Sequence, residues 1–289
     1  MTTESDALSD AILVNHGNAN IIIGYADKTD RLERCCVRFR SLEHNNIYTL
    51  ENLQFIKNEV FPLLDDFLIT VKKIERNVNC LATLLTKFKV DLDSKVVQVL
   101  EMENLTYGMN SVVTVDHFTK VHRNVSSDCS RAVVWEFKPK WLAQYGENCR
   151  NCALNRMKGR DISYCYNMVL SRPKELKKWF STEQLPSQFF SDMEKYFENP
   201  KNVLATLYGA QRKLRNSVPP LTDLTSQNDV SDILALLMTL RDVTCFVRWD
   251  PQCGISAKIV DVDSKPKSKW SQWKAQQEKL NASGVQVFH

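Results

Sequence analysis

The chain has 289 residues, 43% of them hydrophobic, and a formal net charge of +4 at pH 7. This length and apolar content suffice for one large domain or two lobes with ordinary cores. The small net charge does not call for a nucleic-acid coat protein or a polybasic membrane binder.

The sequence also bears on the environment of the protein. Its longest apolar run, Ile233 to Leu240, is far shorter than the roughly 20 residues that span a bilayer. Residues 1–10 are polar and acidic, unlike a secretory signal. Nine cysteines at irregular positions predict reduced thiols rather than a disulfide framework. We therefore expect a soluble intracellular protein without a membrane partner.

The N-terminal part of the sequence predicts a sheet with one packed helix. Alternation and β-branched runs predict strands within residues 12–25, 35–40, 95–102 and 111–115. The first of these segments contains a polar turn with Gly17, which divides it into two strands. Helical spacing over residues 50–71, with a breaker at Pro62, predicts an interrupted helix followed by a strand.

The rest of the chain is mainly helical after one more strand at residues 132–137. Its predicted elements are a helix from Asn199-Pro200 to about 215, an apolar helix at 233–240, strands at 244–249 and 257–262, and a basic helix at 265–280. We predict an α+β fold with a β-rich N-terminal lobe, residues 1–118, and a mainly helical C-terminal lobe, residues 119–289. A ligand cleft is expected between the lobes.

Two aspartates follow predicted elements of the C-terminal lobe, 19 positions apart (261 − 242). Asp242 follows the apolar helix and Asp261 lies at the end of a strand, so a β-hairpin would bring them together. In kinases one carboxylate orients or deprotonates the attacking hydroxyl, and a second holds the Mg²⁺ that bridges the ATP phosphates. Taken alone, the spacing favours the alternative that both are helix-cap or turn residues.

Basic residues near strand ends are candidates for phosphate contacts. Lys138 and Lys140 flank Pro139, and the period of a strand would aim both cations to the same side. Arg38, on the predicted third strand, would reach ATP phosphates under the loop at Gly17. The alternatives are a solvated strand residue for Arg38 and a plain turn for Gly17.

A lysine- and tryptophan-rich segment follows Asp261. It contains Lys265, Lys267, Lys269 and Lys274, interleaved with Pro266, Trp270 and Trp273. On a helix, the pairs Lys265/Lys269 and Lys269/Trp273 would share one face. Two like charges at this spacing are unfavourable unless an anion neutralises them, so the segment is typical of an anion site. A solvated basic face with two core tryptophans is an equal alternative.

Three cysteines have part of the spacing of a zinc site. Cys149 and Cys152 form a C-x-x-C pair, and Cys165 lies downstream. No fourth ligand is evident, because none of the five histidines lies between His122 and His289. We therefore expect free thiols, with a structural zinc as the alternative.

Taken in order, these motifs resemble the inositol-pentakisphosphate 2-kinase family, most closely its short fungal members, over essentially the whole chain. The motifs are GNAN from Gly17, VRF from Val37, the helix around Pro62, DHF from Asp116, EFKPKWL from Glu136, CRNC from Cys149, RDVTCF from Arg241 and DVDSKPK from Asp261. The resemblance implies transfer of the γ-phosphate of ATP to the 2-hydroxyl of inositol 1,3,4,5,6-pentakisphosphate, which gives phytate. It also implies a fold distantly like that of protein kinases.

The resemblance further implies a role for individual residues. Asp242 would be the catalytic base and a weaker magnesium ligand, Asp261 the main magnesium ligand, and Lys138 a bridge between ATP and the acceptor. The nucleotide side would consist of Gly17, Asn18, Ala19, Asn20, Arg38, Asp116, His117 and Glu136. The inositide pocket would consist of Lys140, Lys158, Asn202, Lys265, Lys269 and Trp273.

Several expectations about partners complete this interpretation. ATP and Mg²⁺ are implied as cofactors, and some family members hold a structural zinc in the C-terminal lobe. We expect a monomer that binds a small-molecule substrate and requires no nucleic acid, with the nuclear location implied by the fungal family. Two alternatives remain, an inactive inositol-phosphate-binding protein and an RNA-associated adaptor that uses the lysine- and tryptophan-rich helix. Only the enzyme needs both Asp242 and Asp261.

Overall fold

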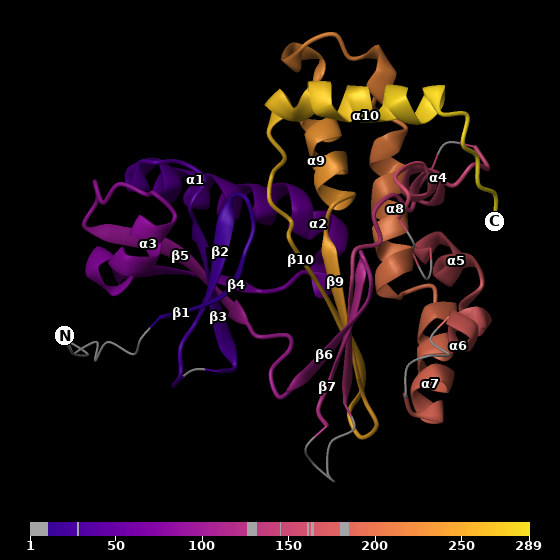
Figure 1. Cartoon of the computed structure of the whole chain (residues 1–289), viewed down its shortest axis with the longest axis horizontal. Helices are drawn as coiled ribbons and strands as arrows, with labels where there is room; N and C mark the ends of the chain where they lie inside the picture. Colours follow the sequence, from indigo (N-terminus) through magenta and orange to yellow (C-terminus); the bar gives the residue numbers. More distant parts are fainter. Residues whose placement is uncertain are drawn as a thin grey trace. The chain divides into compact units, whose positions relative to one another are not determined.

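The computed structural model describes residues 11–27, 29–125, 132–144, 146–160, 162, 165–179 and 185–289. The fold is α+β, as predicted, with two five-stranded antiparallel sheets and several helices (Figure 1). The chain forms two compact units. The first consists of the described residues up to Phe55 together with Ile69–Tyr107, and the second consists of Ile56–Leu68 and Gly108–His289.

The first unit is built on one sheet with the strand order β1-β2-β3-β5-β4. Its elements are β1 (Ile12–His16), β2 (Asn20–Gly24), β3 (Arg31–Cys36), α1 (Leu42–Phe55), β4 (Val71–Asn77), η3 (Val78–Cys80), α3 (Ala82–Lys87) and β5 (Val96–Glu103). Alternate residues of a strand share a face, so Ile21 and Ile23 of β2 both enter the core. There they join Leu42 of α1, Leu85 of α3 and Val99 of β5.

The first helix begins earlier than the sequence predicts. Helix α1 begins at Leu42, where the Ser41 hydroxyl accepts a hydrogen bond from the His44 N–H at 3.1 Å. The buried face of α1 includes polar residues such as Asn45, which weakens the apolar periodicity. The predicted interruption is present, since η1 (Ile56–Val60) separates α1 from α2 (Phe61–Leu64). Pro62 lies in the first turn of α2, where its missing N–H is tolerated.

The third strand lies earlier in the chain than predicted, and Arg38 is not on it. Strand β3 ends at Cys36 and contains Glu33, a buried acid that a search for apolar alternation does not assign to a core. Beyond the strand, the Asn45 side chain accepts a hydrogen bond from the Phe39 N–H at 2.9 Å and donates one to the Phe39 carbonyl at 2.8 Å. These bonds turn the chain toward α1.

The second unit contains the sheet β10-β9-β8-β7-β6. Its strands are β6 (Ser111–Asp116), β7 (Thr119–Arg123), β8 (Val133–Phe137), β9 (Thr244–Asp250) and β10 (Gly254–Val260). The sequence analysis missed β7, a short strand with charged and polar residues. Trp135 and Phe137 of β8 are fully buried, and the Tyr166 ring stacks on Phe137 with 4.3 Å between centroids. This aromatic cluster packs helices against the sheet.

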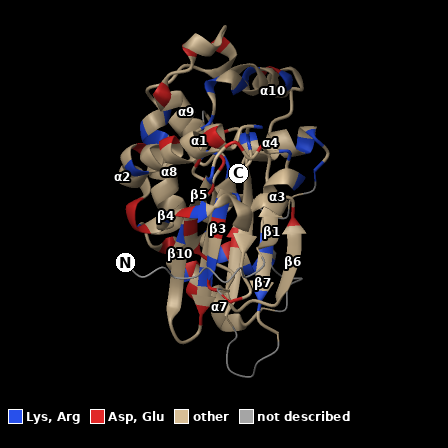
Figure 2. Cartoon of the chain, turned by 90° about the vertical axis from the view of Figure 1, so that its left-hand side faces the viewer, with Lys and Arg blue, Asp and Glu red and all other residues tan. Residues whose placement is uncertain are grey.

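The helices of the second unit provide its remaining core. They are α2, α4 (Arg150–Met157), α5 (Tyr166–Ser171), α6 (Leu176–Trp179), α7 (Ser187–Glu198), α8 (Val203–Arg215), α9 (Asp232–Leu240) and α10 (Trp270–Ala282). Short helical turns are η1, η2 (Asp65–Phe67), η4 (Pro173–Glu175), η5 (Leu221–Asp223), η6 (Gln227–Asp229) and η7 (Lys267–Lys269). Figure 2 shows Lys and Arg in blue on both α4 and α10.

Two helices of this unit begin later than predicted. The cap of α8 is Asn202 rather than Asn199, and its side-chain oxygen accepts a hydrogen bond from the Ala205 N–H at 2.9 Å. Pro266 is extended, the turn η7 spans Lys267–Lys269, and helix α10 begins at Trp270. Lys265 therefore lies outside the helix, and the predicted helical pairing of Lys265 with Lys269 is wrong.

Two further observations concern only the described part of the chain. None of its helices combines the length and the apolar composition that crossing a membrane requires. Eight cysteines in these ranges are free thiols, and Cys129 lies outside them.

The buried ion pair of the first unit gives a prediction about stability. The Glu33 side chain is 3% exposed, pairs with the Arg76 guanidinium and accepts a hydrogen bond from the Tyr25 hydroxyl at 2.8 Å. Arg76→Met leaves this carboxylate buried without its cation, so the free energy of unfolding should fall by about 3 kcal/mol in urea denaturation. Lys72→Met, at an exposed position of the same strand β4, is the control. Equal stability of the two variants would contradict the prediction.

Candidate functional site

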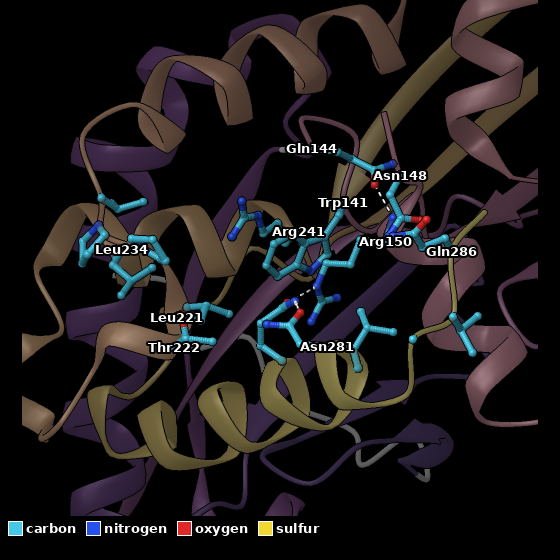
Figure 3. A pocket seen from close by; sticks show the side chains of 17 residues that line it. Trp141, Gln144, Asn148, Arg150, Leu221, Thr222, Leu234, Arg241, Asn281 and Gln286 are labelled. Atoms are coloured by element: carbon cyan, nitrogen blue, oxygen red, sulfur yellow. Dashed lines mark hydrogen bonds between the residues drawn. The ribbon is translucent and has the colours of Figure 1, made fainter. Parts of the chain in front are cut away.

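Two cavities in the second unit share one wall. The larger has a volume of about 570 Å³ and lies among the segment 218–222, α10 and the loop before α4 (Figure 3). The smaller has a volume of about 270 Å³ and lies beside the end of β8 and the start of α10. Trp141, Arg150 and Arg241 line both cavities and form the wall between them.

This wall is a stack of two guanidinium groups on one indole. The central carbons of Arg150 and Arg241 lie 3.7 and 3.5 Å from the Trp141 ring centroid. At these distances each group lies directly over the ring, and two groups over the same face would overlap, so they cover opposite faces. Burial lowers the pKa of Arg150 to about 10, which leaves the group charged at neutral pH. The stack fixes two positive charges by cation–π contacts.

The smaller cavity is strongly basic. Its lining contains the cations Lys140, Arg150, Lys158, Arg160, Arg241, Lys265 and Lys269. Asp242 is the only carboxylate among its lining residues. Such an excess of convergent ammonium and guanidinium groups suits a compact ligand with several phosphates. Burial, followed by Arg160 and Lys140, lowers the pKa of His117, a further lining residue.

A buried glutamine fixes the backbone around this cavity. The Gln211 side chain is fully buried and donates hydrogen bonds to the carbonyls of Lys140 and Leu240, each at 2.9 Å. Its oxygen accepts hydrogen bonds from the N–H groups of Leu142 and Ala143 at 2.9 and 3.2 Å. One amide of α8 therefore joins the segment after β8 to the end of α9. Asp242 lies two residues beyond that junction.

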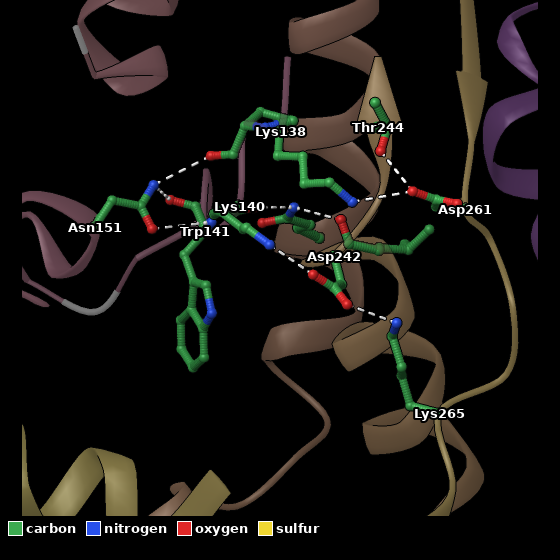
Figure 4. Close-up of polar contacts among 11 residues, drawn as sticks. Lys138, Lys140, Trp141, Asn151, Asp242, Thr244, Asp261 and Lys265 are labelled. Atoms are coloured by element: carbon green, nitrogen blue, oxygen red, sulfur yellow. Dashed lines mark hydrogen bonds and ion pairs between the residues drawn. The ribbon is translucent and has the colours of Figure 1, made fainter. Parts of the chain in front are cut away.

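Asp242 is held between two lysines (Figure 4). Its two oxygens, Oδ1 and Oδ2, lie 2.6 Å from the Nζ atoms of Lys140 and Lys265, respectively. Burial would raise the pKa of Asp242, but the two ammonium groups outweigh it and lower this pKa to about 2. Burial and the neighbouring cations Lys138 and Lys265 hold the pKa of Lys140 below its ordinary value despite the ion pair.

Asp261 forms a second acidic position at the end of β10. In the β9–β10 hairpin Thr244 pairs with Val260, so Asp261 follows directly. Its Oδ2 accepts hydrogen bonds from the Thr244 hydroxyl at 2.6 Å and from Lys138 Nζ at 3.0 Å (Figure 4). The hairpin thus brings Asp261 back to Thr244 at the start of β9. Thr244 lies two residues after Asp242 in the sequence. Burial would lower the pKa of Lys138, but Asp261 raises it overall.

The two lysines around Pro139 do not follow the strand period from which a common direction was predicted. Strand β8 ends at Phe137, and Lys140 has a φ of +57°, in the left-handed region. Strand alternation therefore does not extend across Pro139. Lys138 pairs with Asp261, whereas Lys140 pairs with the other carboxylate, Asp242.

Comparisons with known proteins identify the family. The inositol-pentakisphosphate 2-kinase family matches residues 14–198 and 183–279. The inositol-pentakisphosphate 2-kinase of Saccharomyces cerevisiae is 39% identical, with 96% of this chain and 98% of the relative covered. The enzymes of the same name from Eremothecium gossypii and Candida glabrata are 37% and 35% identical, covering 96% of this chain and 99% and 100% of the relatives. The chain belongs to the inositol-pentakisphosphate 2-kinase family.

The residues of this family member that were predicted to bind ATP phosphates lie in the first unit. The turn between β1 and β2 is closed by a hydrogen bond from the Gly17 N–H to the Asn20 carbonyl at 2.8 Å. Asn18 and Ala19 form its tip, and the Ala19 carbonyl accepts a hydrogen bond from the Val37 N–H at 2.9 Å. The Arg38 guanidinium lies over the Phe39 and Tyr48 rings, 5.4 and 5.1 Å from their centroids. ATP contacts of these residues remain predictions.

The other residues predicted on the nucleotide side lie in the second unit. Asp116 ends β6 and His117 begins the turn to β7, where Asp116 accepts a hydrogen bond from the Phe118 N–H at 2.8 Å. Glu136 pairs with His122 at 2.7 Å and with Lys120 at 3.2 Å. Burial would raise the pKa of Glu136, but these two partners lower it overall. Glu136 is therefore a charged acid whose carboxylate is engaged within the sheet.

The structure brings together most of the inositide residues that were predicted for this kinase family. Lys140, Lys158, Lys265, Lys269 and Trp273 line the smaller cavity. Asn202 is not among its lining residues, because its buried side chain caps α8, and its contact with the inositide remains a prediction.

Sequence reasoning missed the three arginines of the cavity. Arg241 stands next to Asp242, and Arg150 lies within the C-x-x-C motif, so both were read as parts of other motifs. Arg160 follows the segment that supplied Lys158. Their convergence depends on the packing of α4 and α9, which the sequence does not reveal. The only signal in the sequence was that each of the three arginines lies close to a residue or motif that was already assigned a role.

A cluster of thiols with one imidazole lies at the start of α4. One ligand atom from each of Cys149, Cys152, Cys165 and His289 lies within 4.8 Å of the others. Cys152 Sγ is 3.2 Å from His289 Nε2, and Cys149 Sγ is 3.5 Å from Cys165 Sγ. The ligand atoms of tetrahedral zinc are about 3.7 Å apart for bonds of about 2.3 Å, so the four groups fit this metal. Sequence analysis found no fourth ligand because His289 is 137 positions from Cys152.

The lysine pair around Asp242 gives a prediction about its titration. In the double variant Lys140→Met and Lys265→Met, burial remains and both ammonium groups are lost. The pKa of Asp242 should then rise from about 2 to above the ordinary value of about 3.9. In the unmodified protein the pairs stabilise the fold above that ordinary pKa and are lost as the pH falls toward 2.

Carboxyl ¹³C NMR of labelled aspartate measures this pKa directly. Lys267→Met is the matched control, because Lys267 lies near Lys265 but pairs with Asp232 at 2.8 Å. A pKa of Asp242 that stays near 2 in the double variant would show that the two lysines do not control it.

Proposed function

We propose that this protein transfers the γ-phosphoryl group of ATP to the 2-hydroxyl of inositol 1,3,4,5,6-pentakisphosphate, which gives inositol hexakisphosphate. Membership of the inositol-pentakisphosphate 2-kinase family and the names of the relatives support the reaction. The observation that carries the proposal for this chain is the basic cavity around Asp242.

The charge of the cavity suits the acceptor. Five phosphates carry roughly −1.5 to −2 each near neutral pH, so the substrate presents an extreme local charge. Seven cationic side chains converge on about 270 Å³, and Asp242 is the one acid among the lining residues. Lys140, Lys158, Lys265 and Lys269 bind the phosphates in this proposal, and Asn202 is retained as a predicted contact. Trp273 forms part of the apolar surface beside them.

Asp242 acts as the base in the proposed reaction. Its carboxylate accepts the proton of the attacking hydroxyl, while the lysines around it hold the acceptor in place. Lys138, which pairs with Asp261 in the structure, contacts the transferred phosphoryl group. Asp261 holds Mg²⁺ with a weaker contribution from Asp242, since carboxylate oxygens are the ligands that this ion prefers. When bound, Mg²⁺ neutralises the phosphate oxygens of ATP.

The remaining predicted residues bind the nucleotide in this proposal. The turn Gly17 to Asn20 and Arg38 contact the ATP phosphates, Asp116 and His117 lie beside the adenine, and Glu136 helps to position the nucleotide. We assign ATP handling to an N-terminal lobe, residues 1–118, and the inositide to a C-terminal lobe, residues 119–289, in an organisation distantly like that of protein kinases. The nuclear location and the monomeric state rest on the family resemblance alone.

The decisive experiment is an assay of the purified protein with Mg-ATP and inositol pentakisphosphate, with anion-exchange separation of the products. Inositol hexakisphosphate should form, and its absence would refute the proposed function. Asp242→Asn should lower kcat by about 100-fold or more, because the amide cannot accept the proton, while inositide affinity changes little. Asp232→Asn is a control outside the cavity. Full turnover of Asp242→Asn would exclude the base role.

A structural zinc is a further cofactor that we propose. Cys149, Cys152, Cys165 and His289 would supply a closed set of four ligands, which is typical of structural rather than catalytic zinc. The Gln144 and Asn167 side chains donate hydrogen bonds to Cys149 Sγ at 3.3 and 3.6 Å. Such outer contacts orient a thiolate ligand. The site would tie the segment around His289 to the start of α4.

Metal analysis tests this cofactor. The protein should contain about one zinc per chain by mass spectrometry, and a strong chelator should lower the Tm because zinc binding is coupled to folding. His289→Ala should weaken zinc affinity by at least about tenfold. Cys253→Ser, at an exposed cysteine outside the cluster, should have no effect. A chain free of zinc after purification in zinc-containing medium would refute the site.

A further inference from the structure

The larger cavity has no role in the proposed reaction, although its size suits an organic ligand. Its volume of about 570 Å³ lies within the range of about 300–1,000 Å³ that is typical of small-molecule sites. Apart from the wall of Trp141, Arg150 and Arg241, its lining residues differ from those of the smaller cavity. None of the described residues that line it is a lysine. The larger cavity is therefore separate from the inositide pocket.

The two ends of this cavity differ in chemistry. Leu221 and Leu234 lie at one end (Figure 3) and belong to a hydrophobic cluster that includes Trp141. The other end carries the amides of Gln144 and Gln286. Gln286 is exposed, so this end opens to solvent. An apolar body would displace water from the first end at a gain in free energy, while the second end offers hydrogen bonds.

The charges on the cavity are positive and lie between its two ends. Arg150 and Arg241 are the charged members of the described lining, which contains no acid. Both lie beside Trp141, between the apolar end and the amide end (Figure 3). A cationic ligand would be repelled here, and a neutral ligand would gain nothing from either charge. The shared wall therefore favours an anion.

Arg150 can donate hydrogen bonds to such an anion. Its Nε donates to Gln277 Oε1 at 2.8 Å, and its Nη2 donates to Gln276 Oε1 at 3.5 Å. Both acceptors are neutral amides, and no carboxylate in the described part of the chain pairs with this guanidinium group. A carboxylate is a stronger acceptor than an amide, because its charge strengthens the bond and its two oxygens match the planar guanidinium. Gln277 lines the larger cavity, so a carboxylate there would lie beside it.

We propose that the larger cavity binds a small organic carboxylate with an apolar body. The carboxylate pairs with Arg150 beside Gln277, and the apolar body packs against the cluster around Leu221 and Leu234. An inositol polyphosphate does not suit this cavity, because two guanidinium groups cannot neutralise several phosphates and the apolar end offers them no partners.

Occupation of the larger cavity opposes inositide binding. Arg150 and Arg241 line both cavities, so an anion in one cavity lowers the positive potential in the other. Coupling between two sites is reciprocal, so each ligand weakens the binding of the other by the same factor. The carboxylate is thus an inhibitor of the proposed kinase. This antagonism rests on the proposed function, whereas binding of the carboxylate does not.

Three naphthalene compounds with the same apolar body test the class of ligand. They are 2-naphthoate, 2-naphthylmethylammonium and 2-naphthalenemethanol, which carry a negative, a positive and no charge. Binding to the purified full chain is measured by ¹⁵N NMR titration. Naphthoate should bind with a Kd of about 1 mM or tighter for its size, and the other two should bind at least about 10-fold more weakly. The largest shifts should fall on Leu221 and on residues 284–286.

An isosteric variant places the negative charge in the protein itself. Gln277→Glu puts a carboxylate where an amide now accepts the hydrogen bond from Arg150 Nε. It should weaken naphthoate binding at least about 10-fold, because the new charge pairs with the guanidinium group and repels the probe. Gln272→Glu makes the same change at an exposed position of α10 that lines neither cavity, and its Kd should stay within about twofold.

A second variant tests the cavity without a change of charge. Val285→Trp fills part of the larger cavity from the segment after α10 and should also weaken naphthoate binding at least about 10-fold. Val112→Trp introduces the same side chain at an exposed position of β6, outside both cavities, and should bind naphthoate like the unmodified protein.

Calorimetric titration with inositol pentakisphosphate, without nucleotide, tests the antagonism. Saturating naphthoate should raise the Kd of the pentakisphosphate by about fivefold or more, and the pentakisphosphate should raise the Kd of naphthoate by the same factor. Sodium acetate at equal concentration has the carboxylate without the apolar body and serves as the control for ionic strength. It should leave the Kd of the pentakisphosphate within about twofold.

Each part of the proposal can fail separately. Equal affinity for the three naphthalene compounds, or shifts far from the cavity, would overturn the ligand class. Unchanged naphthoate binding to both Gln277→Glu and Val285→Trp would overturn the site. An inositide Kd that naphthoate does not change would overturn the antagonism. The proposed function fails instead if inositol hexakisphosphate does not form, and naphthoate binding is measured without any turnover.

Discussion

The amide of Gln211 is the interaction on which the candidate site depends. It makes four hydrogen bonds inside the second unit, two as donor and two as acceptor, and all four partners are backbone groups. These partners belong to the chain after β8 and to the end of α9. Both segments lie at the end of a regular element, where the side chain supplies hydrogen-bond partners for backbone groups. A buried amide without these partners would be costly, which makes the arrangement specific.

Around this fixed point the site is built from opposed charges. Asp242 and Asp261 each pair with a lysine from the segment Lys138 to Lys140. The stack of Arg150, Trp141 and Arg241 adds two cations whose position depends on ring contacts rather than on an acid. The lysines near the acids are held by ion pairs, whereas the arginines of the stack lie on the faces of a ring. The pocket therefore combines a positive wall packed on an indole with ammonium groups paired to acids.

Much of the fold was predictable because its strands have strong local signals. The β-branched residues of β5 and β6 and the apolar run of α9 show their structure in the sequence. The errors occur where tertiary contacts override local pattern. Strand β3 buries Glu33 because Arg76, 43 positions away, neutralises it, and α1 buries amides that hide its apolar face. A local pattern of apolar residues reveals neither the cation that neutralises Glu33 nor the burial of these amides.

The candidate site was predictable only in part. The order of its motifs pointed to the two aspartates and to most of the lysines, and the β9–β10 hairpin places Asp261 as the spacing suggested. The role of Gln211 and the position of His289 could not be read from the sequence, because each depends on contacts between distant segments. The predicted helix began at Lys265, whereas Pro266 is extended and α10 begins only at Trp270.

Lys140 and Asp261 share a backbone feature that bears on how this protein can be engineered. Both have positive φ angles, +57° and +61°, in the region that costs a residue with a Cβ atom roughly 1 kcal/mol or more. Glycine would relieve this strain at either position, and a search for stabilising substitutions would therefore favour it. Glycine at position 140 would remove one of the two lysine partners of Asp242, and glycine at position 261 would remove the second carboxylate itself. Gains in stability at these two positions would thus be obtained at the expense of the pocket chemistry.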